Sequence, residues 1–150
     1  MIFNQIDQPA LTDDIKLVIA NTFVNSLKRN EWENMRAILA DDATWTLPGT
    51  SLLSGLANGA EAIISRAQGL KNFGVNFSLK HILIGINGFS LSLHNTASRG
   101  DLILDEQVAI VFELKNNIIV SMATYLSDVP GINAFFIEGV HKEIQSQSNE

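Results

Sequence analysis

The sequence predicts an α+β domain in which three N-terminal helices pack on the concave face of a curved antiparallel sheet. Apolar residues recur at helical spacing in the first half of the chain, whereas the second half alternates with a period of two. Two turns that suit hairpins, Asn87-Gly88 and Asn116-Asn117, divide the second half into strands. Helices followed by a meander of strands are typical of α+β architecture. A curved sheet covered in this way encloses a cone-shaped interior.

Three helices account for the first half. Thr12 has the position of a capping residue, and Asp13 and Asp14 suit the positive end of the helix dipole. The apolar face of this helix consists of Ile15, Val18, Ile19, Thr22, Phe23 and Leu27. A shorter second helix begins near Trp32 and is expected to end at Asp41-Asp42. The third helix follows the capping-box-like pair Asn58 and Glu61.

The strands follow from alternation and turn residues. The segment 43–47 alternates and is stopped by Pro48-Gly49, and the small, glycine-rich segment 51–59 is expected to be a loop. Four antiparallel strands are predicted over 76–86, 89–97, 107–115 and 118–127. In the third of these, Val108, Ile110, Phe112 and Leu114 share one face, and Glu106 is expected to be solvated. A short helix is predicted within 132–144.

The bulk properties restrict the classes of function. The chain has 150 residues, no cysteine and a net charge of −6. We expect one domain over 1–150, with residues 1–11 as a lead-in and residues 145–150 as a disordered polar tail. The acidic charge and scattered basic residues argue against nucleic acid as a partner. No run of about 18 apolar residues and no secretory signal are present, so we expect no membrane span and a cytoplasmic protein.

Three segments carry a resemblance to a known family. These are LADDATWTLPG at 39–49, SGLANGAEAI at 54–63, and VFELKNNII at 111–119, which leads to TYLSD at 124–128. They resemble the SnoaL-like and ketosteroid-isomerase-like group of the NTF2-like superfamily. The resemblance implies a conical α+β barrel, an apolar small-molecule pocket between sheet and helices, and a homodimer that packs through the sheet. It does not imply one chemistry, because the group includes isomerases, polyketide cyclases, epoxide hydrolases and proteins without known activity.

The resemblance also argues against the ketosteroid isomerase mechanism. The catalytic carboxylate of that family precedes the proline that ends the first strand, and here that position is Leu47. The tyrosine that donates a hydrogen bond aligns with Phe23, and the donor acid aligns near Ala109 and Ile110. None of these side chains can exchange a proton at neutral pH.

Three other residues are candidates for acid–base chemistry. Asp128 follows the last strand, where the resemblance places an acid in SnoaL-like cyclases, although it could equally cap the turn before Pro130. His81 and His94 lie on strands, where a histidine is either a pocket group or an ordinary core residue. The alternation of side chains along a strand does not by itself place both histidines on the same face of the sheet, because a bulge would move one of them to the other face.

Four residues are expected to contact an apolar ligand: Trp45, Leu47, Phe23 and Tyr125. Packing in the core is the alternative role for the tryptophan and the tyrosine. No metal site and no cofactor are expected, because His81, His94 and His141 lack close spacing and no glycine-rich phosphate loop is present.

Two functional hypotheses therefore stand side by side. The first is a pocket that binds an apolar small molecule and carries out cofactor-independent isomerase- or cyclase-type chemistry. The second is a non-catalytic ligand-binding or dimeric interaction module of the same fold, with its pocket filled by its own side chains. A cavity below about 300 Å³ would favour the second.

Overall fold

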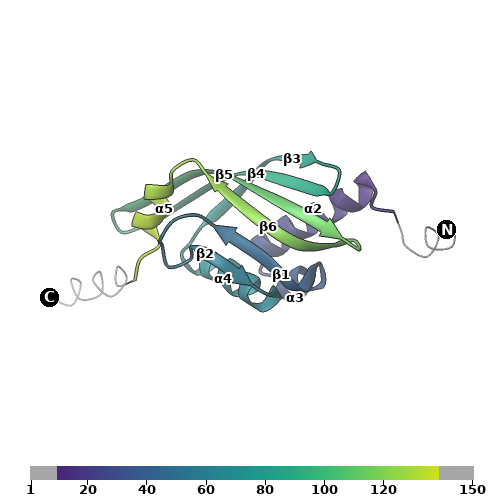
Figure 1. Cartoon of the computed structure of the whole chain (residues 1–150). Helices are drawn as coiled ribbons and strands as arrows, with labels where there is room; N and C mark the ends of the chain where they lie inside the picture. Colours follow the sequence, from purple (N-terminus) through teal and green to yellow (C-terminus); the bar gives the residue numbers. More distant parts are fainter. Residues whose placement is uncertain (1–9, 139–150) are drawn as a thin grey trace.

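The computed structural model describes residues 10–138 and forms an α+β fold (Figure 1). The predicted tail at 145–150 and most of the predicted lead-in lie outside the described residues. The elements follow the chain in this order: α2 (Asp13–Arg29), α3 (Trp32–Ala37), β1 (Leu39–Leu47), β2 (Gly55–Asn58), α4 (Ala60–Asn72), β3 (Asn76–Ile84), β4 (Gly88–Arg99), β5 (Leu102–Lys115), β6 (Ile118–Leu126) and α5 (Val129–Phe135). The α+β prediction is confirmed.

The six strands form one sheet with the order β2-β1-β6-β5-β4-β3. All neighbours are antiparallel except β1 and β6, which pair in parallel. The sheet is therefore mixed rather than purely antiparallel. A parallel pair is possible here because helix α4 and four intervening strands provide the long connection that parallel neighbours need.

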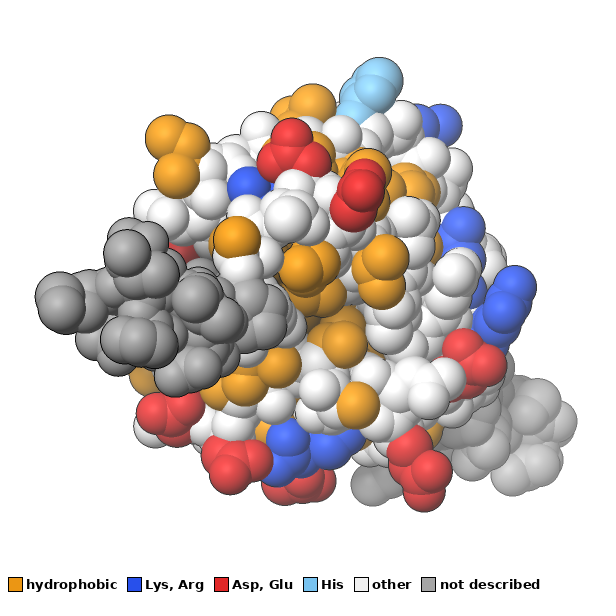
Figure 2. Space-filling model, turned by 90° about the vertical axis from the view of Figure 1, so that its right-hand side faces the viewer, with side chains coloured by type: hydrophobic (Ala, Val, Ile, Leu, Met, Phe, Trp, Pro, Cys, Tyr) orange, Lys and Arg blue, Asp and Glu red, His pale blue; other side chains and the backbone are white. Residues whose placement is uncertain are grey.

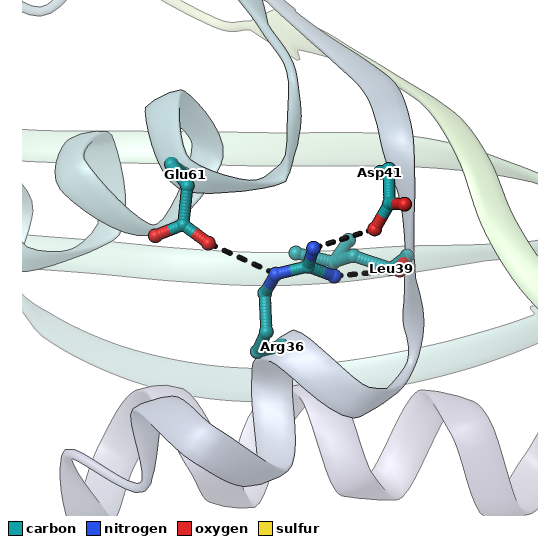
Figure 3. Close-up of polar contacts among 4 residues, drawn as sticks. All are labelled: Arg36, Leu39, Asp41 and Glu61. Carbon is teal, nitrogen blue, oxygen red and sulfur yellow. Dashed lines mark hydrogen bonds and ion pairs between the residues drawn. The ribbon is translucent and has the colours of Figure 1, made fainter.

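The junction between α3 and β1 differs from the expectation. Helix α3 ends at Ala37, and Asp41 and Asp42 belong to β1 rather than to the end of the helix. In Figure 3, Arg36 of α3 donates hydrogen bonds to Asp41 Oδ1 at 2.6 Å, to Glu61 Oε1 at 2.9 Å and to Leu39 O at 3.3 Å. This exposed cluster joins the end of α3 to β1 and the start of α4.

The segment expected to be a loop at 51–59 contains the short edge strand β2. Its residues pair with β1 from Thr44↔Asn58 to Leu47↔Gly55. Gly55 has a φ of 104°, a left-handed conformation that glycine adopts without strain. The glycine-rich composition thus marks the entry to an edge strand.

The core lies between α2, α4 and the sheet. Phe23 on α2 is fully buried, with its ring centroid 6.5 Å from that of Trp45 and 4.9 Å from that of Phe112. Phe112 in turn stacks on Phe89 at 4.5 Å. Complete burial of each such side chain contributes about 1.5–3 kcal/mol, so this aromatic row fixes the first helix on the sheet.

The surface also carries apolar groups. Figure 2 shows hydrophobic side chains at the end of the molecule that lies on the right in Figure 1. Exposed large hydrophobic residues near the turn after β3 include Leu83, Ile84 and Ile86. No helix within residues 10–138 is long and apolar enough to cross a membrane.

Candidate functional site

A small cavity lies in the interior of the cone, between the sheet and the helices. Its volume is about 30 Å³. The wall receives residues from α2, α4, α5 and five of the six strands, and most of the lining side chains are apolar. The polar groups of the lining are Asn95, Glu106 and Thr124, together with the indole N–H of Trp45. A space of this size holds about two water molecules.

Glu106 is the ionisable group of this cavity. Its residue is 1% exposed on β5, and its Oε1 accepts hydrogen bonds from the Asp128 N–H at 3.1 Å and the Ser127 hydroxyl at 3.5 Å. Burial raises the pKa of Glu106, and the nearby Asp128 charge raises it further, whereas the two hydrogen bonds act in the opposite direction. The net effect is a raised pKa, so this carboxyl keeps its proton to a higher pH than an exposed glutamate does.

Asn95 faces Glu106 across the β4–β5 ladder. The two residues are direct Cα partners, and both side chains point to the cavity side of the sheet. Asn95 is 9% exposed, and its Oδ1 is buried without a hydrogen-bond partner among residues 10–138. An unpaired buried acceptor costs about 1–3 kcal/mol. The cavity therefore presents a carboxyl group with a raised pKa and an amide oxygen without a partner, in apolar surroundings.

Trp45 forms part of the opposite wall. Its Nε1–H donates a 2.7 Å hydrogen bond to Thr124 Oγ1 on β6, and both residues are buried. This bond satisfies the indole N–H and fixes the ring plane.

The structure does not bring the three predicted acid–base residues together in the cavity. Asp128 is exposed and caps α5, where its Oδ1 accepts a hydrogen bond from the Gly131 N–H at 3.0 Å. His81 is exposed, and His94 is half-buried with its Nε2 at 2.5 Å from Asp105 Oδ1. Both histidines lie on the outer face of the sheet.

A bulge in β3 explains the position of His81. Leu79 pairs with Leu93, but His81 pairs with Ser92, so Lys80 is an additional residue in this strand. Strict alternation along 76–86 would place Phe77, Leu79, His81 and Leu83 on one face, and the bulge breaks this pattern at Lys80. After the bulge, Ile82 packs against the core while His81 and Leu83 face outward.

The residues expected to contact a ligand are divided. Trp45 and Leu47 line the cavity, whereas Phe23 lies behind Trp45 in the aromatic row and is not part of the lining. Tyr125 is 62% exposed and pairs with Ala109. It follows Thr124 on β6, and because successive side chains of a strand point to opposite faces, Tyr125 lies on the outer face of the sheet. Tyr125 therefore does not line this cavity.

Sequence reasoning missed the two groups that define the cavity. The expectation of a solvated Glu106 is wrong, because β5 begins at Leu102 and Glu106 continues the inward face of Val108 and Ile110. Counting back by two from Val108 would have found it. Asn95 follows Leu91 and Leu93 by the same rule. Among the described residues, no group of three histidine, aspartate or glutamate side chains could hold a metal ion.

Comparisons with known proteins agree with this fold. No family model and no curated protein matches the chain. Among solved structures, Bal32a from a soil-derived mobile gene cassette superposes with a TM-score of 0.76 at 24% identity, over 82% of this chain and 97% of its own. An NTF2-like protein from Burkholderia xenovorans gives 0.70 at 15% identity, with 85% and 99% covered.

A further solved structure has a named activity. An LEH-like epoxide hydrolase from Mycobacterium tuberculosis gives a TM-score of 0.64 at 17% identity, with 89% of this chain and 97% of that chain covered. These similarities show that the chain has the NTF2-like fold. The resemblance noted in the sequence is thereby confirmed at the level of the fold.

Proposed function

We propose that the cavity binds a small, mainly apolar molecule through an oxygen atom and that Glu106 is the acid–base group of the site. The observation that carries this proposal is the buried carboxyl of Glu106 opposite the unpaired Oδ1 of Asn95. A core that served only for packing would gain nothing from these groups, since burial of a polar group without a partner costs free energy. A ligand that pairs with them would recover that cost.

The chemistry of the two groups defines the ligand class. Neutral Glu106 donates to a carbonyl, hydroxyl or epoxide oxygen, and Asn95 Oδ1 accepts from a hydroxyl or a water molecule. The apolar lining matches a hydrocarbon body. The LEH-like neighbour, whose name states an activity on epoxides, supports an oxygenated apolar ligand as a class. The site uses no cofactor in this proposal.

Ligand binding requires the cavity to enlarge. Its volume of about 30 Å³ is far below the ~300 Å³ of ordinary ligand pockets. Ile132 on α5 and Phe136 just after it contribute to the wall, and α5 packs mainly on β5. Outward movement of this short helix is the route to a larger pocket.

Cyclohexanone is a suitable probe, because it combines a carbonyl oxygen with an apolar ring. We expect saturable binding, followed by amide NMR shifts around the cavity, that weakens as pH rises and Glu106 loses its proton. Glu106→Gln retains an N–H donor and should bind without this pH dependence, whereas Glu106→Ala should lose binding. Methylcyclohexane, which lacks the oxygen, is the matched control ligand. Equal binding of both molecules by the wild-type protein would reject the role of Glu106.

The small cavity favours a second candidate function, a non-catalytic dimeric interaction module. The outer face of the sheet carries exposed apolar side chains, with Val111 47% and Tyr125 62% exposed beside the small residues Ala109 and Ala123. Large exposed apolar groups on one face of a sheet suit contact with a second copy of the chain. We propose this face as a homodimer interface, which is compatible with either function of the cavity.

A further inference from the structure

Arg66 on α4 is a buried cation without an acidic partner. Its residue is 8% exposed, and two basic residues, Lys16 and Arg66, are buried among residues 10–138. Lys16 pairs with Asp13 at 3.3 Å, whereas no carboxylate of the described residues lies within 4.0 Å of Arg66. A buried charge is ordinarily paired, because its removal from water is costly. In a chain with sixteen acids and ten bases, the absence of a partner requires an explanation.

The contacts of Arg66 use only part of its donors. Nη1 donates to Trp45 O at 2.6 Å and Nη2 donates to Gly55 O at 2.9 Å, and the guanidinium lies 5.2 Å from the centroid of the Trp45 ring. These neutral partners hold the side chain in one position. A guanidinium has five N–H groups, so three remain without a partner among the described residues. Burial lowers the pKa of Arg66, but an arginine stays charged at neutral pH.

An open depression of about 220 Å³ lies beside this guanidinium, between β2 and α4. Arg66 and Ser65 contribute polar groups to its lining, and Ser65 is exposed. Leu52 and Leu56 form an apolar rim and are 52% and 61% exposed. A fixed cation next to exposed leucines matches a molecule with a negative head and a short apolar body.

We propose that the depression between β2 and α4 binds the carboxylate of a small apolar acid, with Arg66 as the cationic anchor. The planar guanidinium forms paired hydrogen bonds with a carboxylate, and Leu52 and Leu56 cover the apolar part of the ligand. This site is separate from the cavity of Glu106. The two sites have no lining residue in common, and of the helices and strands only α4 contributes to both, so each proposal can be tested independently of the other.

Sodium benzoate tests the proposal on the full chain, with benzamide as the neutral analogue and sodium chloride to hold the ionic strength constant. We expect saturable amide NMR shifts at Gly55, Leu56 and Ser65 with benzoate, and binding weaker by about tenfold or more with benzamide, as expected for loss of charge-assisted hydrogen bonds. Inorganic phosphate should bind more weakly than benzoate because it lacks the apolar body. Equal binding of benzoate and benzamide, or tighter binding of phosphate, would overturn the assignment.

Substitutions at Leu56 avoid any loss of the Arg66 contacts. Leu56→Asp places a carboxylate in the depression as an internal competitor and should weaken benzoate binding by about tenfold or more. The matched variant Leu56→Asn loses the same apolar contact without adding a charge, so it should bind benzoate about tenfold or more tightly than Leu56→Asp does. Arg66→Met, if it folds, should lose binding. Benzoate affinity that is the same in the Leu56→Asp and Leu56→Asn variants would reject the site.

Discussion

Asn95 on β4 and Glu106 on β5 are direct cross-strand partners, and both side chains face the interior cavity. One brings an amide oxygen without a partner, and the other brings a carboxyl with a raised pKa. Cross-strand partners on one face lie about 5 Å apart at Cβ, so a single small ligand or water molecule can contact both. This pair is the basis of the function proposed for the cavity.

The stability of the protein should depend on the protonation of Glu106. Because its pKa is raised above the ordinary value of 4.5, the folded state binds the proton more tightly than the unfolded state does. The contribution of Glu106 is therefore fully favourable below pH 4.5 and is lost as pH rises through the folded pKa. We expect Glu106→Gln to remove this dependence, because the amide is neutral throughout and can still accept from the Asp128 N–H.

Urea denaturation of both proteins between pH 4.5 and 8 measures this effect. The difference in the free energy of unfolding, Glu106→Gln minus wild type, should increase with pH and then level off. A difference that stays constant across this range would show that Glu106 has an ordinary pKa in the folded state.

Replacement of Asn95 by leucine should stabilise the fold. The substitution removes the unpaired Oδ1 and keeps the same branched shape, and the adjoining cavity of about 30 Å³ gives room for the larger methyl groups, so we expect a gain of about 1–3 kcal/mol in the free energy of unfolding. Cyclohexanone affinity is the second readout, and it should fall if Asn95 positions the ligand or its bridging water. Asn95→Asp is a matched polar control. A marked loss of stability in Asn95→Leu would indicate that Oδ1 has a partner in solution.

Much of this arrangement could be predicted from the sequence, because hydrophobic periodicity and turn residues are local signals. Ile19, Phe23 and Leu27 of the expected apolar face of α2 are buried, whereas Val18 is 64% exposed and its place on that face is wrong. The hairpin between β3 and β4 and the inward face of β5 are confirmed. The bulge at Lys80 has no local signature, and this one residue reverses the side on which His81 lies. The parallel pairing of β1 with β6 is a long-range contact that no periodicity specifies.

The candidate site was predicted less well for a physical reason. Trp45 and Leu47 were found because apolar residues mark an inward face. Glu106 and Asn95 break that pattern, and a polar residue near a predicted strand end is ordinarily solvated. The predicted strand begins at residue 107, whereas β5 begins five residues earlier, at Leu102. Glu106 therefore lies well inside the strand rather than before its start.

Two substitutions at Asp128 should separate a capping role from a catalytic one. Asparagine caps a helix as well as aspartate does, so Asp128→Asn should change the free energy of unfolding by less than about 0.5 kcal/mol. Asp128→Ala loses the hydrogen bond from the Gly131 N–H and should cost about 0.5–2 kcal/mol. Thermal denaturation at neutral pH compares the two. A loss of ligand binding or turnover in Asp128→Asn, with stability unchanged, would instead assign Asp128 to the site.

The outer sheet face should hold two copies of the chain together. The expected mass in solution is twice the 16.4 kDa of the monomer, measured by light scattering after size-exclusion chromatography. Val111→Lys places a charge in the middle of the exposed apolar face and should give the monomer mass. Val18→Lys, a comparable change at a 64% exposed position on α2, is the control for surface charge alone. A wild-type protein of about 16 kDa would remove the dimer proposal without affecting the cavity.

The most direct test of the central claim is a pH titration of the Glu106 side chain by ¹³C NMR, with the carboxyl resonance assigned by its absence in Glu106→Gln. We predict a midpoint above 4.5 that rises further when cyclohexanone is added, since the ligand oxygen pairs with the protonated acid. A midpoint at or below 4.5 that cyclohexanone does not change would contradict Glu106 as the acid of this cavity.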